Sequence, residues 1–270
     1  KTLIGIDPLF GLDPESREGT RAVGPFTAIW FAAFMVPFFL WVKEPKVERR
    51  KLHIGLAMAS LRDLIAGLRY RNSLAAFLLA SLFYRDALNA LYAFGGVYAS
   101  GVLNWEVQQI GIFGIVGVIA AVVASWIGGK ADKRFGPKPV IAFSIVVLIC
   151  VVSIIVGLTR EQIFGLPLDP ASRSSDNILF VCGAFIGAAG GALQSASRTL
   201  MVRHTTPDQA TEAFGLFALS GKVASFISPA LIGLVTGISG SQRIGMFPLI
   251  VMFAIGLGLL FFVRARGEQV

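Results

Sequence analysis

Apolar residues gather along this chain into runs of about 20, separated by polar stretches. Coiled as a helix at about 1.5 Å per residue, such a run spans the hydrocarbon core of a bilayer. One run precedes a long polar connector, and six follow it in close succession. The pattern predicts an all-α, polytopic transmembrane helical bundle. The runs cover residues 25–42, 73–103, 107–127, 140–158, 178–202, 213–236 and 247–263.

The polar segments divide the rest of the chain. Residues 1–24 contain two turn-forming Asp-Pro pairs and are predicted as an extracytoplasmic loop. Residues 43–72 form a basic connector, residues 73–263 the six-span bundle, and residues 264–270 a tail. Apolar side chains of the connector recur at helical spacing, which is typical of an amphipathic helix on a membrane surface. They are Ile54, Met58, Leu61, Ile65 and Leu68.

Composition supports a membrane protein and gives no sign of an enzyme. The chain is 55% hydrophobic and 15% charged, whereas a soluble domain usually carries about 25% charged residues. Cys150 and Cys182 both lie inside apolar runs and are predicted to pack there rather than to form a disulfide. The sequence has no metal-ligand cluster, phosphate-binding loop or nucleophile motif. We therefore expect no catalytic residue, no metal and no cofactor.

The net charge of +8 reflects membrane topology rather than a nucleic-acid surface. Segments predicted on one side of the membrane hold sixteen Lys and Arg residues, and those on the other side hold six. The first set comprises eight residues in 43–72, four in 128–139, and Arg198, Arg203, Arg264 and Arg266. The second set is Lys1, Arg17, Arg21, Arg160, Arg173 and Arg243. The positive-inside rule then places the connector and the C-terminus in the cytoplasm.

Charged residues inside the spans are the first candidates for function. Arg85 and Asp86 interrupt the span 73–103, and Lys222 interrupts the span 213–236. Each charge costs about 2.5–3.5 kcal/mol on membrane-insertion scales, so it should face protein or water. Asn89 and Tyr92 add polar groups to adjoining faces of the same helix as Arg85.

Asp86 and Lys222 lie at similar depths from the predicted cytoplasmic surface, so we expect an interhelical pair between them, direct or through water. Two interpretations of that pair are open: a site that responds to protons or solute, and a permanent structural pair. Gln194 and Arg198 form a second polar patch at four-residue spacing. Arg198 has a further interpretation, in which its side chain extends to the lipid headgroups.

Stripes of small residues indicate close helix packing. Gly183, Gly187 and Gly191 recur every four residues in one span, and Gly111, Gly114 and Gly117 do so every three in another. Small side chains let transmembrane helices approach closely. Packing alone explains these stripes, and a role in helix sliding is the alternative.

The loop GGKADKRFGPK at residues 128–138 resembles the glycine–acid–basic loop of the major facilitator superfamily, which joins the second and third spans of each six-span half. The resemblance implies a conformational lock made of Gly129, Asp132, Lys133, Arg134 and Gly136. The match is imperfect, because Asp132 and Gly136 are four residues apart where the superfamily usually has three.

Further stretches resemble the "unknown major facilitator" branch, which is related to the vacuolar amino-acid effluxers of autophagy. They are AIW at 28–30, Pro37, KEP at 43–45, QSASR at 194–198, FGLF at 214–217, SGK at 220–222, Ser225, and GSQR at 240–243. The resemblance implies that residues 25–42 are the sixth span of the parent fold and residues 73–263 its C-terminal half. An N-terminal half of about five spans would then precede this chain, and two bundles would rock about a central site.

These observations predict a secondary active transporter of a small solute working by alternating access, with amino acids as a candidate solute and protons as a candidate coupling ion. Its pathway residues would be Arg85, Asp86, Asn89, Tyr92, Gln194, Arg198 and Lys222. The alternative is a non-transporting membrane receptor or regulator that keeps the fold. The expected partners are the solute, the lipid bilayer and the N-terminal half, with no nucleic acid. The short loops favour a bacterial inner membrane.

Overall fold

The computed structural model describes residues 11, 13, 16, 18–43, 55, 62, 65–169, 172–206 and 210–267. Seven of its helical segments are long and apolar enough to cross a membrane, which confirms the predicted all-α polytopic class. Most of the predicted amphipathic stripe in the connector lies outside the described residues. The elements are α1 (Glu18–Trp41), η2 (Leu68–Tyr70), α3 (Asn72–Leu103), α4 (Val107–Phe135), α5 (Pro137–Gly157), β1 (Gln162–Ile163), β2 (Leu166–Pro167), α6 (Ser174–Arg203), α7 (Ala210–Val223), α8 (Ile227–Ser239), α9 (Gln242–Gly245) and α10 (Phe247–Leu260).

The chain divides into two units, of which the first contains α1. This helix begins at Glu18, seven residues before the predicted span, so part of the predicted loop 1–24 is helical. Its start is marked by a hydrogen bond from the Asp13 amide to the Glu18 carboxylate, 2.9 Å long. Along one face the ring of Trp30 lies 5.8 Å from that of Phe26 and 4.8 Å from that of Phe34.

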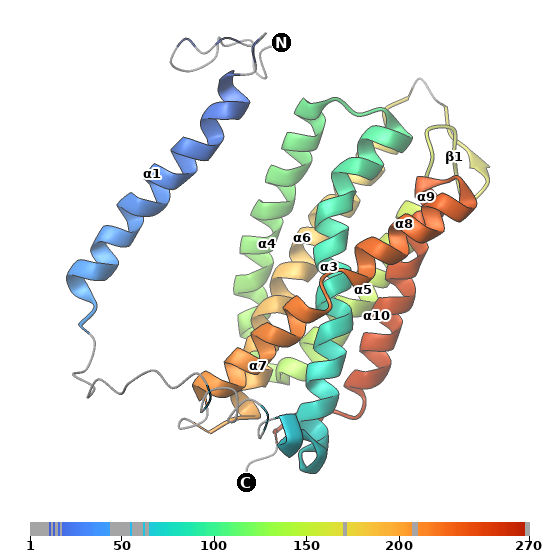
Figure 1. The fold of residues 1–270 in the computed structure, drawn as a ribbon. Helices are drawn as coiled ribbons and strands as arrows, with labels where there is room; N and C mark the ends of the chain where they lie inside the picture. Colours follow the sequence, from blue (N-terminus) through green and yellow to red (C-terminus); the bar gives the residue numbers. More distant parts are fainter. Residues whose placement is uncertain are drawn as a thin grey trace. The chain divides into compact units, whose positions relative to one another are not determined.

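The second unit is a bundle of antiparallel helices (Figure 1). Polar contacts hold each of its two ends together. One end of the bundle carries Lys138 and Arg264, and we call it the basic end. There Lys138 Nζ donates to the carbonyl of Val263 over 2.6 Å, and the Arg264 amide donates to Ser73 Oγ over 2.8 Å. At the other end, the Tyr98 hydroxyl is bonded to the carbonyl of Leu158. Within this unit, Ser73, Lys138 and Arg264, predicted near one side of the membrane, therefore lie at one end of the bundle.

Glycines hold α4 against α6, as the small-residue stripe predicted. A Cβ added to Gly187 would lie 2.0 Å from the carbonyl oxygen of Gly117, and one added to Gly191 would lie 2.6 Å from that of Ala121. Only glycine allows the two backbones to approach so closely. By contrast, a Cβ at Gly111 or Gly114 would meet nothing within 4 Å.

Several helix ends differ from the predicted boundaries by three residues or more, and the chief changes concern α4 and the predicted span 213–236. Helix α4 continues through most of the predicted basic loop and ends at Phe135, so Gly136 alone, with φ of 89°, makes the turn into α5. Pro137 then starts α5, where its missing N–H costs nothing. The predicted span 213–236 is broken after Val223 and resumes at Ile227.

Candidate functional site

Arg85 lies near the middle of α3 and reaches across to α7. Its Nη1 donates to the carbonyl of Phe217 over 2.9 Å, and its guanidinium carbon lies 4.2 Å from the centre of the Phe217 ring. A Cβ at Gly221 would lie 2.9 Å from the same carbon, so the guanidinium covers the bare backbone of that glycine. A cation over an aromatic face is stabilised by the ring quadrupole. Arg85 is thus fixed in place without a carboxylate.

Asp86 faces the opposite way and caps a helix. It is 1% exposed, and its Oδ2 accepts a 2.8 Å hydrogen bond from the backbone N–H of Ser228. That N–H belongs to the first turn of α8, where amide groups lack partners within the helix. The direct Asp86–Lys222 pair predicted from the sequence is therefore not formed. Depth along the helices suggested that pair, whereas the break before α8 gives the carboxylate a closer partner.

The break itself follows from Pro229. Proline has no N–H and clashes with the carbonyl four residues earlier, here that of Ser225. The chain crosses the break through tighter bonds, from the Ser225 amide to the Lys222 carbonyl and from the Ile227 amide to the Ala224 carbonyl, 3.2 and 2.9 Å long. Lys222, in the last turn of α7, is exposed.

Helix α6 brings the second polar patch beside α3. The buried hydroxyls of Tyr84 and Ser197 are hydrogen bonded over 2.8 Å and set the register of the two helices. The next residues along each helix, Arg85 and Arg198, interact electrostatically. Side chains lean towards the N-terminus of their own helix. Because α3 and α6 run antiparallel, the two guanidinium groups lean towards each other.

Tyr92 and Gln194 continue this polar face. Both side chains are exposed on neighbouring helices, and a Cβ at Gly190 would lie 1.9 Å from the Tyr92 hydroxyl, so only glycine leaves room for the phenol beside α6. Asn89 is exposed one turn from Arg85 on the same side of α3. The structure therefore brings together Arg85, Asn89, Tyr92, Gln194 and Arg198, and we call these five residues the polar face.

A cavity of about 490 Å³ opens beside Tyr92, between α3, α4 and α6. Backbone and small side chains form much of its wall, including Gly96, Gly114 and Gly117. Ligand sites combine an apolar wall with a few placed polar groups. The polar face and this cavity together meet that description, and we take them as the candidate site.

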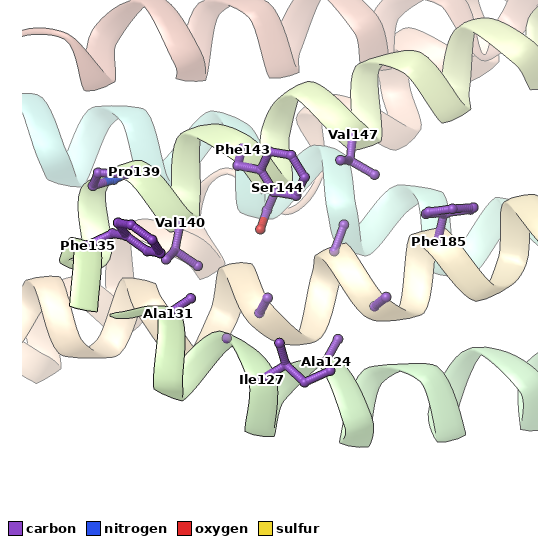
Figure 2. A pocket seen from close by; sticks show the side chains of 14 residues that line it. Ala124, Ile127, Ala131, Phe135, Pro139, Val140, Phe143, Ser144, Val147 and Phe185 are labelled. Atoms are coloured by element: carbon purple, nitrogen blue, oxygen red, sulfur yellow. The ribbon is translucent and has the colours of Figure 1, made fainter. Parts of the chain in front are cut away.

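A second cavity, of about 520 Å³, lies between α4, α5 and α6. Figure 2 shows the hydroxyl of Ser144 directed into it among Phe143, Val147 and Phe185. Its wall is otherwise apolar and has no charged side chain. It therefore lacks the groups that would orient a polar solute.

The predicted lock residues lie at the basic end of α4. The Asp132 side chain is buried, and its Oδ1 has no hydrogen-bond partner among the described residues. Lys133 and Arg134 are exposed, Gly129 is half-buried, and Gly136 turns the chain. A buried carboxylate oxygen without a donor is costly, so this acid is suited to accept a donor from elsewhere in the protein.

Several residues of the site have roles that sequence reasoning missed. Arg85 packs against Phe217 and Gly221, and the Tyr92 hydroxyl packs against Gly190. The Ser228 amide donates a hydrogen bond to Asp86. Pro229 was the available signal for the helix break. Within the described ranges, no three His, Cys, Asp or Glu side chains gather as metal ligands do.

Comparison with known proteins places the chain in a family. The family model described as "Vacuole effluxer Atg22 like" matches residues 3–269. Autophagy-related protein 22 of Cryptococcus neoformans (strain B-3501A) is 27% identical over 286 residues, which cover 100% of this chain and 51% of that protein. The uncharacterized MFS-type transporter YxiO of Bacillus subtilis is 25% identical over 240 residues, 88% of this chain and 52% of that protein.

Autophagy-related protein 22-2 of Emericella nidulans is 24% identical over 300 residues, 99% of this chain and 49% of that protein. The chain thus spans about half the length of the curated relatives it matches. The expected resemblance to the major-facilitator branch of the autophagy effluxers is confirmed over almost the whole chain. The chain belongs to the Atg22-like family of vacuole effluxers, within the major-facilitator type of membrane transporter.

Proposed function

We propose that this chain forms the C-terminal half of a secondary active transporter that moves a small solute by alternating access. The observation that carries the proposal is the polar face beside the 490 Å³ cavity. Arg85 and Arg198 have no carboxylate partner among the described residues. A receptor or regulator that only keeps the fold would be expected to neutralise such charges within the bundle.

The domain assignment belongs to this proposal. Residues 25–42 would be the sixth span of the parent fold, residues 43–72 the cytoplasmic connector, residues 73–263 the second bundle and residues 264–270 a cytoplasmic tail. The first bundle would pack over the polar face, so that the solute site lies between the two halves, as in transporters built from repeated bundles.

The lock residues would act at the cytoplasmic end. The buried Asp132 carboxylate would accept hydrogen bonds from the first bundle in one state and lose them in the other, while Lys133 and Arg134 meet the lipid headgroups. Gly129 and Gly136 would allow the close approach and the turn that this contact needs. Such a contact biases the equilibrium between two states by the difference in its strength between them.

Amino acids are the first solutes to test. The family is described as that of a vacuole effluxer, and the resemblance found in the sequence is to effluxers of amino acids. The full-length protein in proteoliposomes would be given labelled neutral amino acids with and without an imposed proton gradient. We expect uptake into protein-containing vesicles well above that into empty ones. No uptake of any solute in a wide screen, by protein that is folded and correctly inserted, would contradict transport.

The same assay tests proton coupling with Asp86→Asn. The amide oxygen keeps the hydrogen bond to Ser228 but cannot titrate. If Asp86 carries the proton, the gradient no longer accelerates uptake by the variant. If uptake keeps its dependence on the gradient, Asp86 is only a helix cap and coupling lies elsewhere. We place the protein in a cell membrane, as the bacterial relative suggests, and membrane fractionation of the source organism would check this.

A further inference from the structure

Two guanidinium groups share the polar face, and neither is paired with a carboxylate among the described residues. Arg85 and Arg198 directly follow Tyr84 and Ser197, whose hydroxyls are hydrogen bonded between α3 and α6, and two cations on adjoining helices repel each other. The structure records no ion pair of either residue with a described carboxylate within 4.0 Å. Inside a membrane protein the low dielectric strengthens this repulsion and makes an uncompensated cation costly. The arrangement needs an anion.

The nearest acid in the sequence does not supply it. Asp86 follows Arg85 directly, yet adjacent side chains on a helix point about 100° apart. Its carboxylate is 1% exposed and is bonded to the Ser228 amide at the start of α8. Among the described residues, no carboxylate therefore neutralises Arg85, while the acid beside it stabilises the fold.

The guanidinium of Arg85 is also preorganised to bind a ligand. The Phe217 ring and the bare backbone of Gly221 support it from α7, and its hydrogen bond to the Phe217 carbonyl uses one N–H donor. A guanidinium has about five N–H donors in a planar fork that matches a carboxylate in geometry. Arg85 therefore keeps further N–H donors for a ligand, and its side chain is only partly buried.

We propose that Arg85, assisted by Arg198, binds the carboxylate of the transported solute, and that the solute is a monocarboxylate with an apolar remainder. The apolar remainder would extend along α3 past Asn89 towards the cavity beside Tyr92. The inference rests on the proposed function and deepens it, because it assigns a chemical group of the solute to named residues.

The test compares two probes that differ in one group, isocaproate and isocaproamide, which share a carbon skeleton and differ in charge. Thermal unfolding of the full-length protein in detergent reports their binding without any transport step. We expect isocaproate to raise the unfolding temperature and isocaproamide to leave it unchanged. Arg85→Gln should weaken isocaproate binding at least tenfold.

Arg243→Gln is the matched control, since Arg243 is half-buried, lies at the far end of the bundle and has no ion pair with a described carboxylate. It should keep the full response to isocaproate. Equal responses to the two probes, no response to either, or an unchanged response in Arg85→Gln would each overturn the inference.

The unfolding temperature without ligand separates the solute from an acid elsewhere in the protein. Under our proposal Arg198→Gln relieves repulsion with Arg85 and breaks no hydrogen bond, ion pair or ring contact with a described residue, so the unfolding temperature stays the same or rises. If an acidic residue outside the described part were the partner, the substitution would leave that acid unpaired and the unfolding temperature would fall. Binding that depends on Arg85, in a protein that moves no solute, would overturn the proposed transport and leave the anion site standing.

Discussion

Arg85 and Asp86 are neighbours in the sequence with opposite surroundings in the structure. Asp86 is turned into the bundle, where it accepts the Ser228 amide. Arg85 lies on the partly open side of α3, over Phe217 and Gly221. The helical turn between consecutive residues is what separates the two charges. One therefore stabilises the fold while the other remains available to a ligand.

The cap predicts a clear difference between two substitutions of Asp86. Asp86→Ala leaves the Ser228 amide buried without an acceptor and should cost about 1–2 kcal/mol of stability. Asp86→Asn keeps an oxygen at the same place and should cost less than about 0.5 kcal/mol, because Asn caps helices as well as Asp. Thermal unfolding of the full-length protein in detergent would measure both.

Asn89→Ala is the control for this pair, since Asn89 lies one turn further along α3 and its exposed side chain forms no hydrogen bond with a described residue. Its stability should equal that of the unsubstituted protein. Equal losses in Asp86→Asn and Asp86→Ala would mean that the charge of Asp86, rather than its hydrogen bond, stabilises the bundle.

At the scale of elements, hydropathy does not predict the interruption between α7 and α8, whereas the proline at position 229 does. Residues 213–236 are apolar enough to read as one span, and hydropathy does not report the direction of backbone hydrogen bonds. Pro229 removes one such bond and leaves the start of α8 in need of a cap. That the cap is Asp86, 142 residues away, depends on tertiary packing and could not be predicted from spacing.

Pro229→Ala should make the cap less important. An alanine restores the amide at position 229, and a continuous helix would let the Ser228 amide bond to the carbonyl of Ala224. The cost of Asp86→Ala should then fall by about 1 kcal/mol in the Pro229→Ala background, a coupling of the size seen between residues in one network. Unfolding of the two single variants, the double variant and the parent gives this number. Costs that simply add would show that the break is imposed by other contacts.

The packing of α4 on α6 was easier to predict, because closeness depends on residue size alone. Gly187→Ala places a methyl group 2.0 Å from the Gly117 carbonyl oxygen, so the helices must separate. Overpacking of this kind typically costs about 1–3 kcal/mol. A lower unfolding temperature and a smaller monodisperse peak in size-exclusion chromatography would report it.

Gly215→Ala in α7 is the matched control for that substitution. A Cβ there meets nothing within 4 Å, and alanine favours a helix over glycine. This variant should be at least as stable as the parent. If Gly187→Ala behaved in the same way, the close approach of α4 and α6 would not be essential to the bundle.

At the scale of the whole bundle, the order of the spans was predictable and the composition of the site only in part. Length and apolarity determine the spans, and the basic residues indicate which segments share an end. Tyr92 and Gln194 were both expected in the pathway, and the structure places them on neighbouring helices, with the Tyr92 hydroxyl against Gly190 of α6. The sequence could not show that Arg85 rests on Gly221, because that contact depends on how α3 crosses α7.

The two ends of the bundle differ in charge, and this difference predicts its orientation. Lys133 lies at the basic end of α4, and Glu161 lies in the exposed loop that joins α5 to β1 at the opposite end. The positive-inside rule predicts that Lys133 faces the cytoplasm and Glu161 the outside. The C-terminal residues, whose Val263 carbonyl accepts from Lys138, would then also be cytoplasmic.

Single cysteines at these two positions would test the orientation in a protein whose Cys150 and Cys182 have been changed to serine. A membrane-impermeant maleimide applied to intact cells should label Glu161→Cys at least tenfold more than Lys133→Cys. Permeabilised cells should label both, because both side chains are exposed and neither has a hydrogen bond in the structure. The reverse pattern in intact cells would invert the bundle and place the Asp132 end outside. Equal labelling of both positions in intact cells would contradict a bundle whose two ends lie on opposite sides of a membrane.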